Sequence, residues 1–263
     1  MRHVFSTILF LLAIASPAWA AVKVEPIVYK VGNTTHKGHI AYDDAQPGKR
    51  PGVLVIHEWW GLDDHARNSA RKLAEAGYVA LAIDMYGEGK QAHHPDDAKK
   101  FSAETAQNFP LMEQRFDAAY QFLADHQRVD PKRIAAIGYC FGGAVALNMA
   151  RTGKDLRGVV AFHGTLQPIP GPAQKGKVKA KVLVLNGTDD PFVPKDQVAA
   201  FEKEMKDAGV DYKLVNYPGA KHAFTVPEGT AKGQKFSLPL EYNADADKKS
   251  WAEAQAFLAR VLK

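Results

Sequence analysis

Cysteine is almost absent from this sequence. Cys140 is the single cysteine among 263 residues, so the chain cannot form an internal disulfide. The excess of one charge over the other is also small: 34 basic side chains stand against 29 acidic ones, and the formal net charge is only +5. No basic stretch alternates with aromatic residues, as a nucleic-acid groove would require. The composition therefore excludes a disulfide framework and argues against a nucleic-acid partner.

Long hydrophobic runs are missing everywhere except at the N-terminus. A short basic start (1–3) precedes the mostly apolar residues 4–15 and the small residues Ala18 and Ala20. This order is typical of a secretory signal peptide, and the run is shorter than the roughly 20 residues that span a bilayer. We expect cleavage after Ala20, export to the periplasm or the medium, and no membrane contact afterwards. An uncleaved membrane anchor is the alternative.

The rest of the chain alternates apolar runs of strand character with stretches of helical periodicity. The strands are apolar on both faces, which indicates a mostly parallel sheet covered by helices on both sides. An antiparallel hairpin with its turn near Gly32 precedes them. We expect a single α/β domain over 21–263. The predicted strands are 25–30, 36–42, 53–56, 78–83, 133–138, 158–162, 181–185 and 212–217, and the predicted helices are 64–76, 96–108, 111–126, 142–151, 196–208 and 244–262.

The segment around Cys140 has the pattern of a nucleophile elbow. A predicted strand runs into Gly138-Tyr139-Cys140-Phe141-Gly142 and continues directly into a predicted helix. Glycines two positions away on either side leave room for a tight strand-to-helix turn. The first turn of the helix would place unpaired N–H groups beside a thiolate. We expect Cys140 to be a nucleophile; the alternative is a small buried apolar residue.

A cysteine nucleophile needs a base, and the base needs an orienting acid. In elbow enzymes the order along the chain is nucleophile, acid, base. Asp189 and Asp190 follow a predicted strand, at the end where open α/β sheets place their sites. The spacing from Gly187 to Val193 favours Asp190 as the acid, and Asp189 stays open. His222, in the loop before the last helix, is the predicted base, with a surface histidine as the alternative.

Together these motifs resemble the dienelactone hydrolase family of α/β-hydrolases. The resemblance covers nearly all of residues 22–263 and rests on the segments HEWWGL (57–62), DMYG (84–87), GYCFGG (138–143), GTDDPFVP (187–194) and HAF (222–224). It implies an α/β-hydrolase fold, a three-layer sandwich around a mostly parallel sheet, with a catalytic triad. The triad implied by the resemblance is Cys140, Asp190 and His222.

The resemblance also implies roles for three residues next to the triad. Glu58 would lie beside the thiol and help to control its protonation, and its position after the apolar strand 53–56 agrees with this. A buried structural ion pair is the alternative for Glu58. The backbone N–H groups of Trp59 and Phe141 would form the oxyanion hole.

The sequence departs from the family at the two arginines that hold the carboxylate of a dienelactone. The corresponding positions are Glu88 and Val226, so carboxylate recognition is not expected. Nearby aromatic residues favour an apolar acyl or lactone group instead, although the same residues are equally explained as core. The predicted substrate contacts are Trp60, Tyr86, Phe192 and Phe224.

No cofactor and no catalytic metal are predicted. His93 and His94, although followed by two aspartates, are interpreted as part of a solvated loop, and His163 as either a pocket or a packing residue. We expect hydrolysis of a small-molecule carboxylic ester or lactone through a thioacyl intermediate, by a monomer or a weak homodimer. The alternatives are a thiol redox or thioesterase protein that uses Cys140 without the triad, and an inactive hydrolase-fold binding protein.

Overall fold

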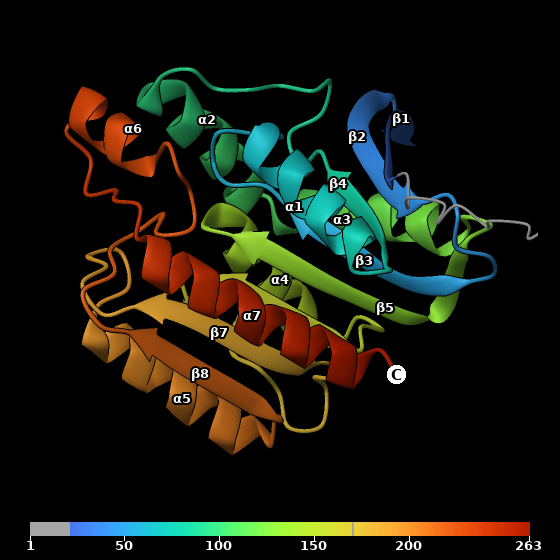
Figure 1. Cartoon of the computed structure of the whole chain (residues 1–263). Helices are drawn as coiled ribbons and strands as arrows, with labels where there is room; N and C mark the ends of the chain where they lie inside the picture. The colour runs from blue at the N-terminus through green and yellow to red at the C-terminus, as the bar shows by residue number, and fades with distance from the viewer. Residues whose placement is uncertain (1–21, 170) are drawn as a thin grey trace, which may run out of the picture.

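The fold is built around one eight-stranded sheet in the order β1-β2-β4-β3-β5-β6-β7-β8 (Figure 1). The computed structural model describes residues 22–169 and 171–263, so the predicted signal peptide lies outside the described residues. The strands are β1 (Val22–Val31), β2 (Thr34–Asp43), β3 (Arg50–Ile56), β4 (Val79–Ile83), β5 (Val129–Tyr139), β6 (Gly158–Phe162), β7 (Lys181–Gly187) and β8 (Tyr212–Tyr217). The helices are α1 (Asp64–Glu75), α2 (Pro95–Gln107), α3 (Phe109–Ala124), α4 (Phe141–Arg151), α5 (Lys195–Ala208), α6 (Gly229–Phe236) and α7 (Ala244–Val261).

The sheet is parallel from β4 to β8 and antiparallel at its N-terminal edge. β1 and β2 form a hairpin whose two-residue turn contains Gly32 with φ 56°, a value that glycine adopts without strain. β2 pairs antiparallel with β4, and every later pairing is parallel. The predicted fold class, a mostly parallel sheet with an N-terminal antiparallel hairpin, is confirmed.

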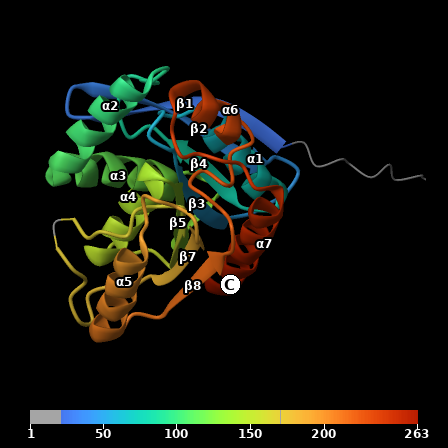
Figure 2. The ribbon, with the colours of Figure 1, turned by 90° about the vertical axis from the view of Figure 1, so that its left-hand side faces the viewer.

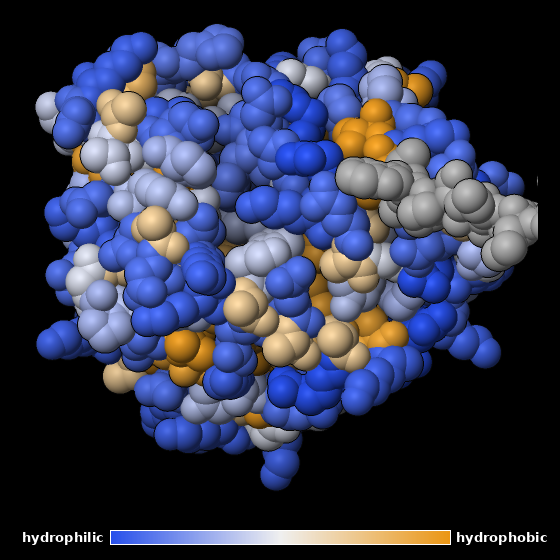
Figure 3. All heavy atoms as spheres, in the orientation of Figure 1, coloured by the Kyte–Doolittle hydropathy of each residue, from blue (hydrophilic) through white to orange (hydrophobic). Residues whose placement is uncertain are grey.

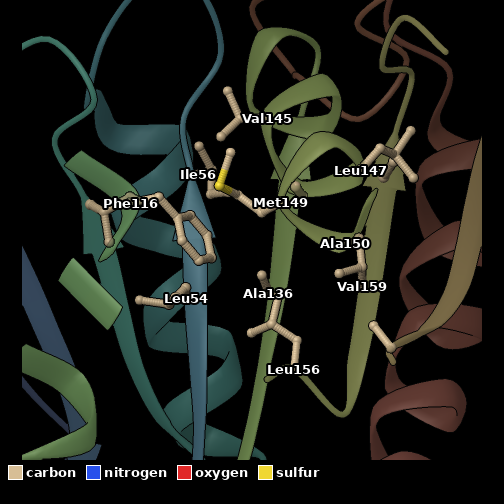
Figure 4. Close-up of a cluster of buried hydrophobic side chains, with 14 of the residues drawn as sticks. Leu54, Ile56, Phe116, Ala136, Val145, Leu147, Met149, Ala150, Leu156 and Val159 are labelled. Carbon is tan, nitrogen blue, oxygen red and sulfur yellow. The ribbon is translucent and has the colours of Figure 1, made fainter. Parts of the chain in front are cut away.

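Helices cover both faces of the sheet, as the apolar strands require. α3, α4 and α5 lie on one face, and α1 and α7 lie on the other (Figure 2). In β3, Leu54 and Ile56 pack with side chains of α3 and α4 (Figure 4), whereas Val53 and Val55 pack with α1. Alternate residues of one strand thus enter two different cores. The parallel strands end at one edge, and the loops that follow them build the site described below.

Two features of the fold lie outside the sequence prediction. The sequence pattern does not predict α6, which has eight residues and two buried glycines. Gly233 is needed there because a Cβ at this position would collide with the backbone carbonyl of Leu240, so packing overrides the low helix propensity of glycine. β5 begins four residues earlier than predicted, at Val129.

The surface is predominantly hydrophilic on the face shown in Figure 3, with apolar residues in small groups. Within the part of the chain that the structure describes, no helix is both long and apolar enough to cross a membrane.

Candidate active site

Cys140 occupies a strained corner between β5 and α4. Its backbone angles are φ 52° and ψ −116°, and a non-glycine residue rarely has a positive φ. Its N–H donates to the carbonyl of Phe162 at 3.0 Å, and its own carbonyl accepts from the N–H of Ala144 at 3.1 Å. The side chain is half-buried and carries a free thiol. Backbone hydrogen bonds on both sides therefore hold the thiol at the carboxyl edge of the sheet.

The flanking glycines are explained by close approach of the backbone. A Cβ on Gly138 would run into the backbone of Gly142, and a Cβ on Gly142 would run into the carbonyl oxygens of Ile56 and His57. Both glycines have no room for any side chain, whatever their φ angles. The Gly-x-Cys-x-Gly pattern is thus a steric requirement of this turn.

The loops after β7 and β8 bring an aspartate and a histidine into contact. Nδ1 of His222 donates to Oδ2 of Asp190 at 2.7 Å, and both residues are buried. The other oxygen of Asp190 accepts from the N–H of Phe192 at 2.8 Å, which fixes the carboxylate. Asp189 is exposed and interacts with the hydroxyl of Thr188 instead. Of the two aspartates left open by the sequence, Asp190 is the partner of His222.

The same histidine interacts with Cys140. Burial by itself would lower the pKa of His222, but the charge of Cys140 and the hydrogen bonds to Asp190 and Cys140 raise that pKa well above its ordinary value. Because Nδ1 is bound to Asp190, the other ring nitrogen, Nε2, is left to face the thiol. The arrangement favours a protonated imidazole at this position.

Glu58 lies in the turn after β3. It is 3% exposed, and burial, reinforced by the charge of Asp63, raises its pKa to about 7. His222 acts on Glu58 in the opposite direction, so the two groups share one electrostatic environment. Among residues 22–169 and 171–263, Glu58 forms no ion pair, which leaves the structural ion-pair alternative without a partner.

Two backbone amides are free to serve as donors near the thiol. Within the described residues, the N–H of Trp59 donates to no protein acceptor, and Phe141 is the first residue of α4, whose N–H has no partner within the helix. The Trp59 carbonyl accepts from the hydroxyl of Tyr86 at 2.9 Å, which holds the turn in place. These are the two amides that the family resemblance implies for an oxyanion hole.

A cavity of about 290 Å³ opens beside Cys140. α4 contributes Phe141, Ala144, Val145 and Asn148 to its wall, which share one face because they are spaced three and four residues apart. Its other lining residues come from the turn after β3, from α2 and α3 and from the loop after β6, namely Trp59, Lys99, Ser102, Ala103, Ala106, Met112, Thr165 and Ile169. The lining is mostly apolar.

The four predicted substrate contacts occupy different places. Tyr86 packs against Phe141, with ring centroids 5.5 Å apart, and Phe192 is 42% exposed with its ring 4.9 Å from that of His222. Trp60 is buried and lines a separate cleft with His93 and Lys232. Phe224 is fully buried against Tyr217. None of the four therefore lines the cavity beside Cys140. Trp60, Tyr86 and Phe224 are large buried rings that this fold uses in packing, and Phe192 lies against His222 instead.

A second buried histidine lies next to His222. The ring of His163 is 5.2 Å from that of His222 and inclined to it by 67°, and its Nε2 is 2.8 Å from the hydroxyl of Thr225. Burial, and then the charge of His222, lower the pKa of His163 well below its ordinary value. His163 is therefore neutral and packs against His222.

The other histidines noted in the sequence stay apart from the site. The side chain of His94 accepts from the N–H of Asp96 and so caps α2. In the described ranges 22–169 and 171–263, no three His, Cys, Asp or Glu side chains are grouped as metal ligands.

Comparison with known proteins gives the family. The family model described as the dienelactone hydrolase family matches residues 37–262. The chain belongs to the dienelactone hydrolase family. The resemblance noted in the sequence is thereby confirmed, and the family relationship supports hydrolase activity.

Relatives of known sequence and structure agree with this membership. Protein usf of Aquifex pyrophilus is 35% identical over 179 residues, 66% of this chain and 76% of the relative. A protein of Aquifex aeolicus, provisionally named a carboxymethylenebutenolidase, is 32% identical over the same shares of both chains. The crystal structure of a dienelactone hydrolase-like promiscuous phosphotriesterase from metagenomic libraries has a TM-score of 0.86 and 33% identity, and covers 92% of this chain and 100% of that one.

This member of the dienelactone hydrolase family differs from the family pattern at the two positions of the carboxylate-binding arginines, Glu88 and Val226. Glu88 is exposed, with its carboxylate 4.0 Å from the Lys90 ammonium, and Val226 is buried. Neither position supplies a cation. Lys99 is the one basic residue among the described residues that line the cavity.

Sequence reasoning overlooked Asn148. Its side chain is 1% exposed and lines the cavity. The signal was present, because Asn148 is the one polar residue between Gly142 and Arg151 in a helix otherwise made of glycine, alanine, valine, leucine and methionine.

Proposed function

We propose that this protein hydrolyses carboxylic esters or lactones, with Cys140 as the nucleophile. The observation that carries the proposal is the contact of His222 with both Cys140 and Asp190, which raises the pKa of the imidazole well above its ordinary value. A protonated imidazole beside a thiolate is what acyl transfer to sulfur requires: a nucleophile already ionised and an acid ready for the leaving group.

The first half of the reaction forms a thioester. The Cys140 thiolate attacks the carbonyl carbon, a C–S bond forms, and the carbonyl oxygen becomes an oxyanion that accepts hydrogen bonds from the amides of Trp59 and Phe141. Each such donor is worth about 3–4 kcal/mol in known acyl-transfer sites. When the intermediate collapses, the C–O bond breaks and Nε2 of His222 gives its proton to the departing alkoxide.

The second half regenerates the thiolate. Nε2 of His222, now neutral, takes a proton from water as the water oxygen attacks the thioester carbonyl. Collapse breaks the C–S bond and releases the carboxylic acid, which leaves the thiolate beside a protonated imidazole. Asp190 holds the ring orientation throughout.

Glu58 has a separate role in this proposal. With a pKa of about 7, it changes between neutral and charged near neutral pH. A neutral Glu58 lets the thiolate and imidazolium form without a second buried negative charge nearby. We infer that protonated Glu58 accompanies the reactive thiolate.

The test is turnover of neutral p-nitrophenyl esters and of an unsubstituted lactone by the wild-type protein and by Cys140→Ala. The proposal predicts hydrolysis by the wild type and loss of at least 10³-fold in kcat for the variant, with an unchanged circular dichroism spectrum. Equal turnover by Cys140→Ala would overturn the proposal. Lack of turnover by the wild type on every ester and lactone would favour a binding protein, and reversible disulfide exchange without turnover would favour a thiol redox protein.

We also propose that the protein is exported, on the basis of residues 1–20 alone. Mass spectrometry of the native protein is expected to find Ala21 at the N-terminus. A retained Met1 would overturn this proposal.

A further inference from the structure

Asn148, which lines the Cys140 cavity, has a buried polar atom without a partner. Nδ2 of Asn148 is buried and donates to no acceptor among residues 22–169 and 171–263. A buried donor without an acceptor costs about 1–3 kcal/mol, so such groups in native proteins call for an explanation. The rest of the cavity wall near Asn148 is apolar, made by Val145 and Ile169 among others.

The orientation of the Asn148 amide is fixed by its other atom. Oδ1 accepts from Nη1 of Arg151 at 3.1 Å and from the N–H of Ile169 at 2.8 Å. Both partners can only donate, so the oxygen must face them and the NH₂ must occupy the other position. Nδ2 is thus a preorganised donor that cannot turn away.

Further contacts make this end of the cavity rigid and electrically balanced. Arg151 forms a bidentate pair with Glu204 at 2.8 and 2.9 Å, and both side chains are buried. The guanidinium also donates to the carbonyl of Leu166, and Glu204 accepts from the N–H of Ala173. The loop after β6 is thereby attached to α4 and α5. Because each charge has its partner, Asn148 presents a neutral donor.

We propose that Asn148 is a specificity-determining residue, which binds a neutral acceptor oxygen, such as a ketone or a second ester carbonyl, in the distal part of the substrate's acyl group. This inference rests on the proposed function and names its substrate class. Asn148 lies eight residues after Cys140 along α4, roughly 12 Å along the helix axis. The distal oxygen is therefore separated from the reacting carbonyl by an apolar chain that fills the space between.

A neutral oxygen fits this end of the cavity better than a carboxylate. Moving an anion out of water costs several kcal/mol unless a cation receives it, and the guanidinium of Arg151 is already neutralised by Glu204. A carbonyl oxygen needs only the one donor. Glu88 and Val226 stand where the family has its two carboxylate-binding arginines. They agree with a neutral ligand, because neither side chain is a cation.

The experiment compares p-nitrophenyl esters of straight-chain acids with the same esters carrying a ketone at each carbon from five to nine. kcat/KM is measured for every pair with the wild type, and the readout is the ratio of ketone to parent ester. We expect the wild type to prefer the ketone at one or two positions, by about tenfold, the size of one buried hydrogen bond. A ratio near or below one at all positions would overturn the proposal. This comparison needs no variant.

The Asn148→Asp variant tests the donor NH₂ of the amide apart from its oxygen. The aspartate keeps an oxygen for Arg151 and for the Ile169 N–H but replaces the donor NH₂ with an acceptor, so the preferred ketone is expected to lose its advantage of about tenfold. Asn68→Asp adds the same charge at an exposed position on α1 and is expected to keep the wild-type ratio. A ketone preference that survives in Asn148→Asp would overturn the assignment.

Failure of this inference can be told apart from failure of the proposed function. If Cys140→Ala retains turnover, the proposed nucleophile is wrong. If turnover requires Cys140 but the ketone ratio is flat, only the role of Asn148 is wrong. A preference for esters that carry a terminal carboxylate over both other sets would also overturn the inference and would point to Lys99.

Discussion

The two sides of Cys140 differ in polarity and in the elements that form them. On one side, loops after β3, β7 and β8 supply Glu58, Asp190 and His222, buried groups whose charges act on one another. On the other side lies a cavity with mostly apolar walls from α2, α3 and α4. The first side is suited to moving protons and the second to holding a chain. In the proposed function, reaction and substrate choice are therefore built on separate elements, which meet at Cys140.

α4 is the element that joins the two sides. Its start carries Cys140 and the Phe141 amide, and its next two turns carry the cavity wall down to Asn148. Variants on the polar side should therefore change the rate for all substrates, whereas variants on the apolar side should change the order of preference.

The largest effect is expected on the polar side, at the aspartate that binds His222. Asp190→Asn is expected to lower kcat by about 10²–10⁴ for every ester, because the amide no longer holds the histidine in its reactive orientation. Asp189→Asn is the matched control and should stay within twofold of the wild type, because Asp189 is exposed. Equal losses in steady-state assays of the two variants would contradict the assignment of the acid.

On the apolar side, the buried pair behind the cavity wall should matter for stability. Arg151→Met is expected to lower the free energy of unfolding by about 3–5 kcal/mol, because it leaves Glu204 charged and buried without a partner. Lys154→Met removes a more exposed cation of the same helix end, which contacts Glu113 and Asp117, and should cost about 1 kcal/mol or less. Urea unfolding measures both, and a small loss for Arg151→Met would show that the pair does not hold this wall.

The raised pKa of Glu58 should make the stability of the protein depend on pH. Its folded-state pKa, about 7, lies above the ordinary value of 4.5, so the native state binds this proton more tightly than the unfolded state does. The contribution of Glu58 to stability is therefore largest below pH 4.5 and is lost as the pH rises to 7. Relative to the wild type, Glu58→Gln should gain about 3 kcal/mol between pH 4 and pH 8.

Urea unfolding at several pH values checks this expectation, with Glu75→Gln, at a half-exposed position on α1, as the control. A difference between Glu58→Gln and the wild type that stays constant with pH would show that the buried carboxyl ionises normally. The same titration should appear as a step near pH 7 in the kcat/KM profile of the wild type, and the step should be absent in Glu58→Gln.

The smallest effect is expected from filling the cavity. Ala106→Leu adds carbon atoms to the wall contributed by α2, so the ratio of kcat/KM for long to short straight-chain esters is expected to fall by about tenfold. Ala252→Leu, at an exposed position of α7, should keep the wild-type ratio. A fall in rate that is equal for long and short chains would contradict the division between the two sides.

Much of the polar side could be predicted from the sequence because its residues follow local rules. The glycines around Cys140, the strand before Asp190 and the chain order of acid and base are readable one segment at a time. The choice between Asp189 and Asp190 needed the structure, because both follow the same strand and only their orientations differ. The fold class was equally readable, since the parallel strands are apolar on both faces.

The apolar side could not be predicted in the same way. Its walls come from three helices and a loop that are distant in sequence, so periodicity alone cannot tell a residue that lines a cavity from one in the core. Trp60 and Phe224 illustrate this, because each belongs to a motif segment yet does not line the cavity. Asn148 was visible as an odd polar residue, but its unpaired donor depends on where Arg151 and Ile169 lie.

The most direct measurement is to look for the acyl group on sulfur. The wild-type protein is mixed with a p-nitrophenyl ester, quenched in acid within the first turnovers, digested and examined by mass spectrometry. The account predicts that the peptide containing Cys140 gains the mass of the acyl group and loses it again as the ester is exhausted. Continued turnover with an unmodified Cys140 at every time of quenching would contradict it.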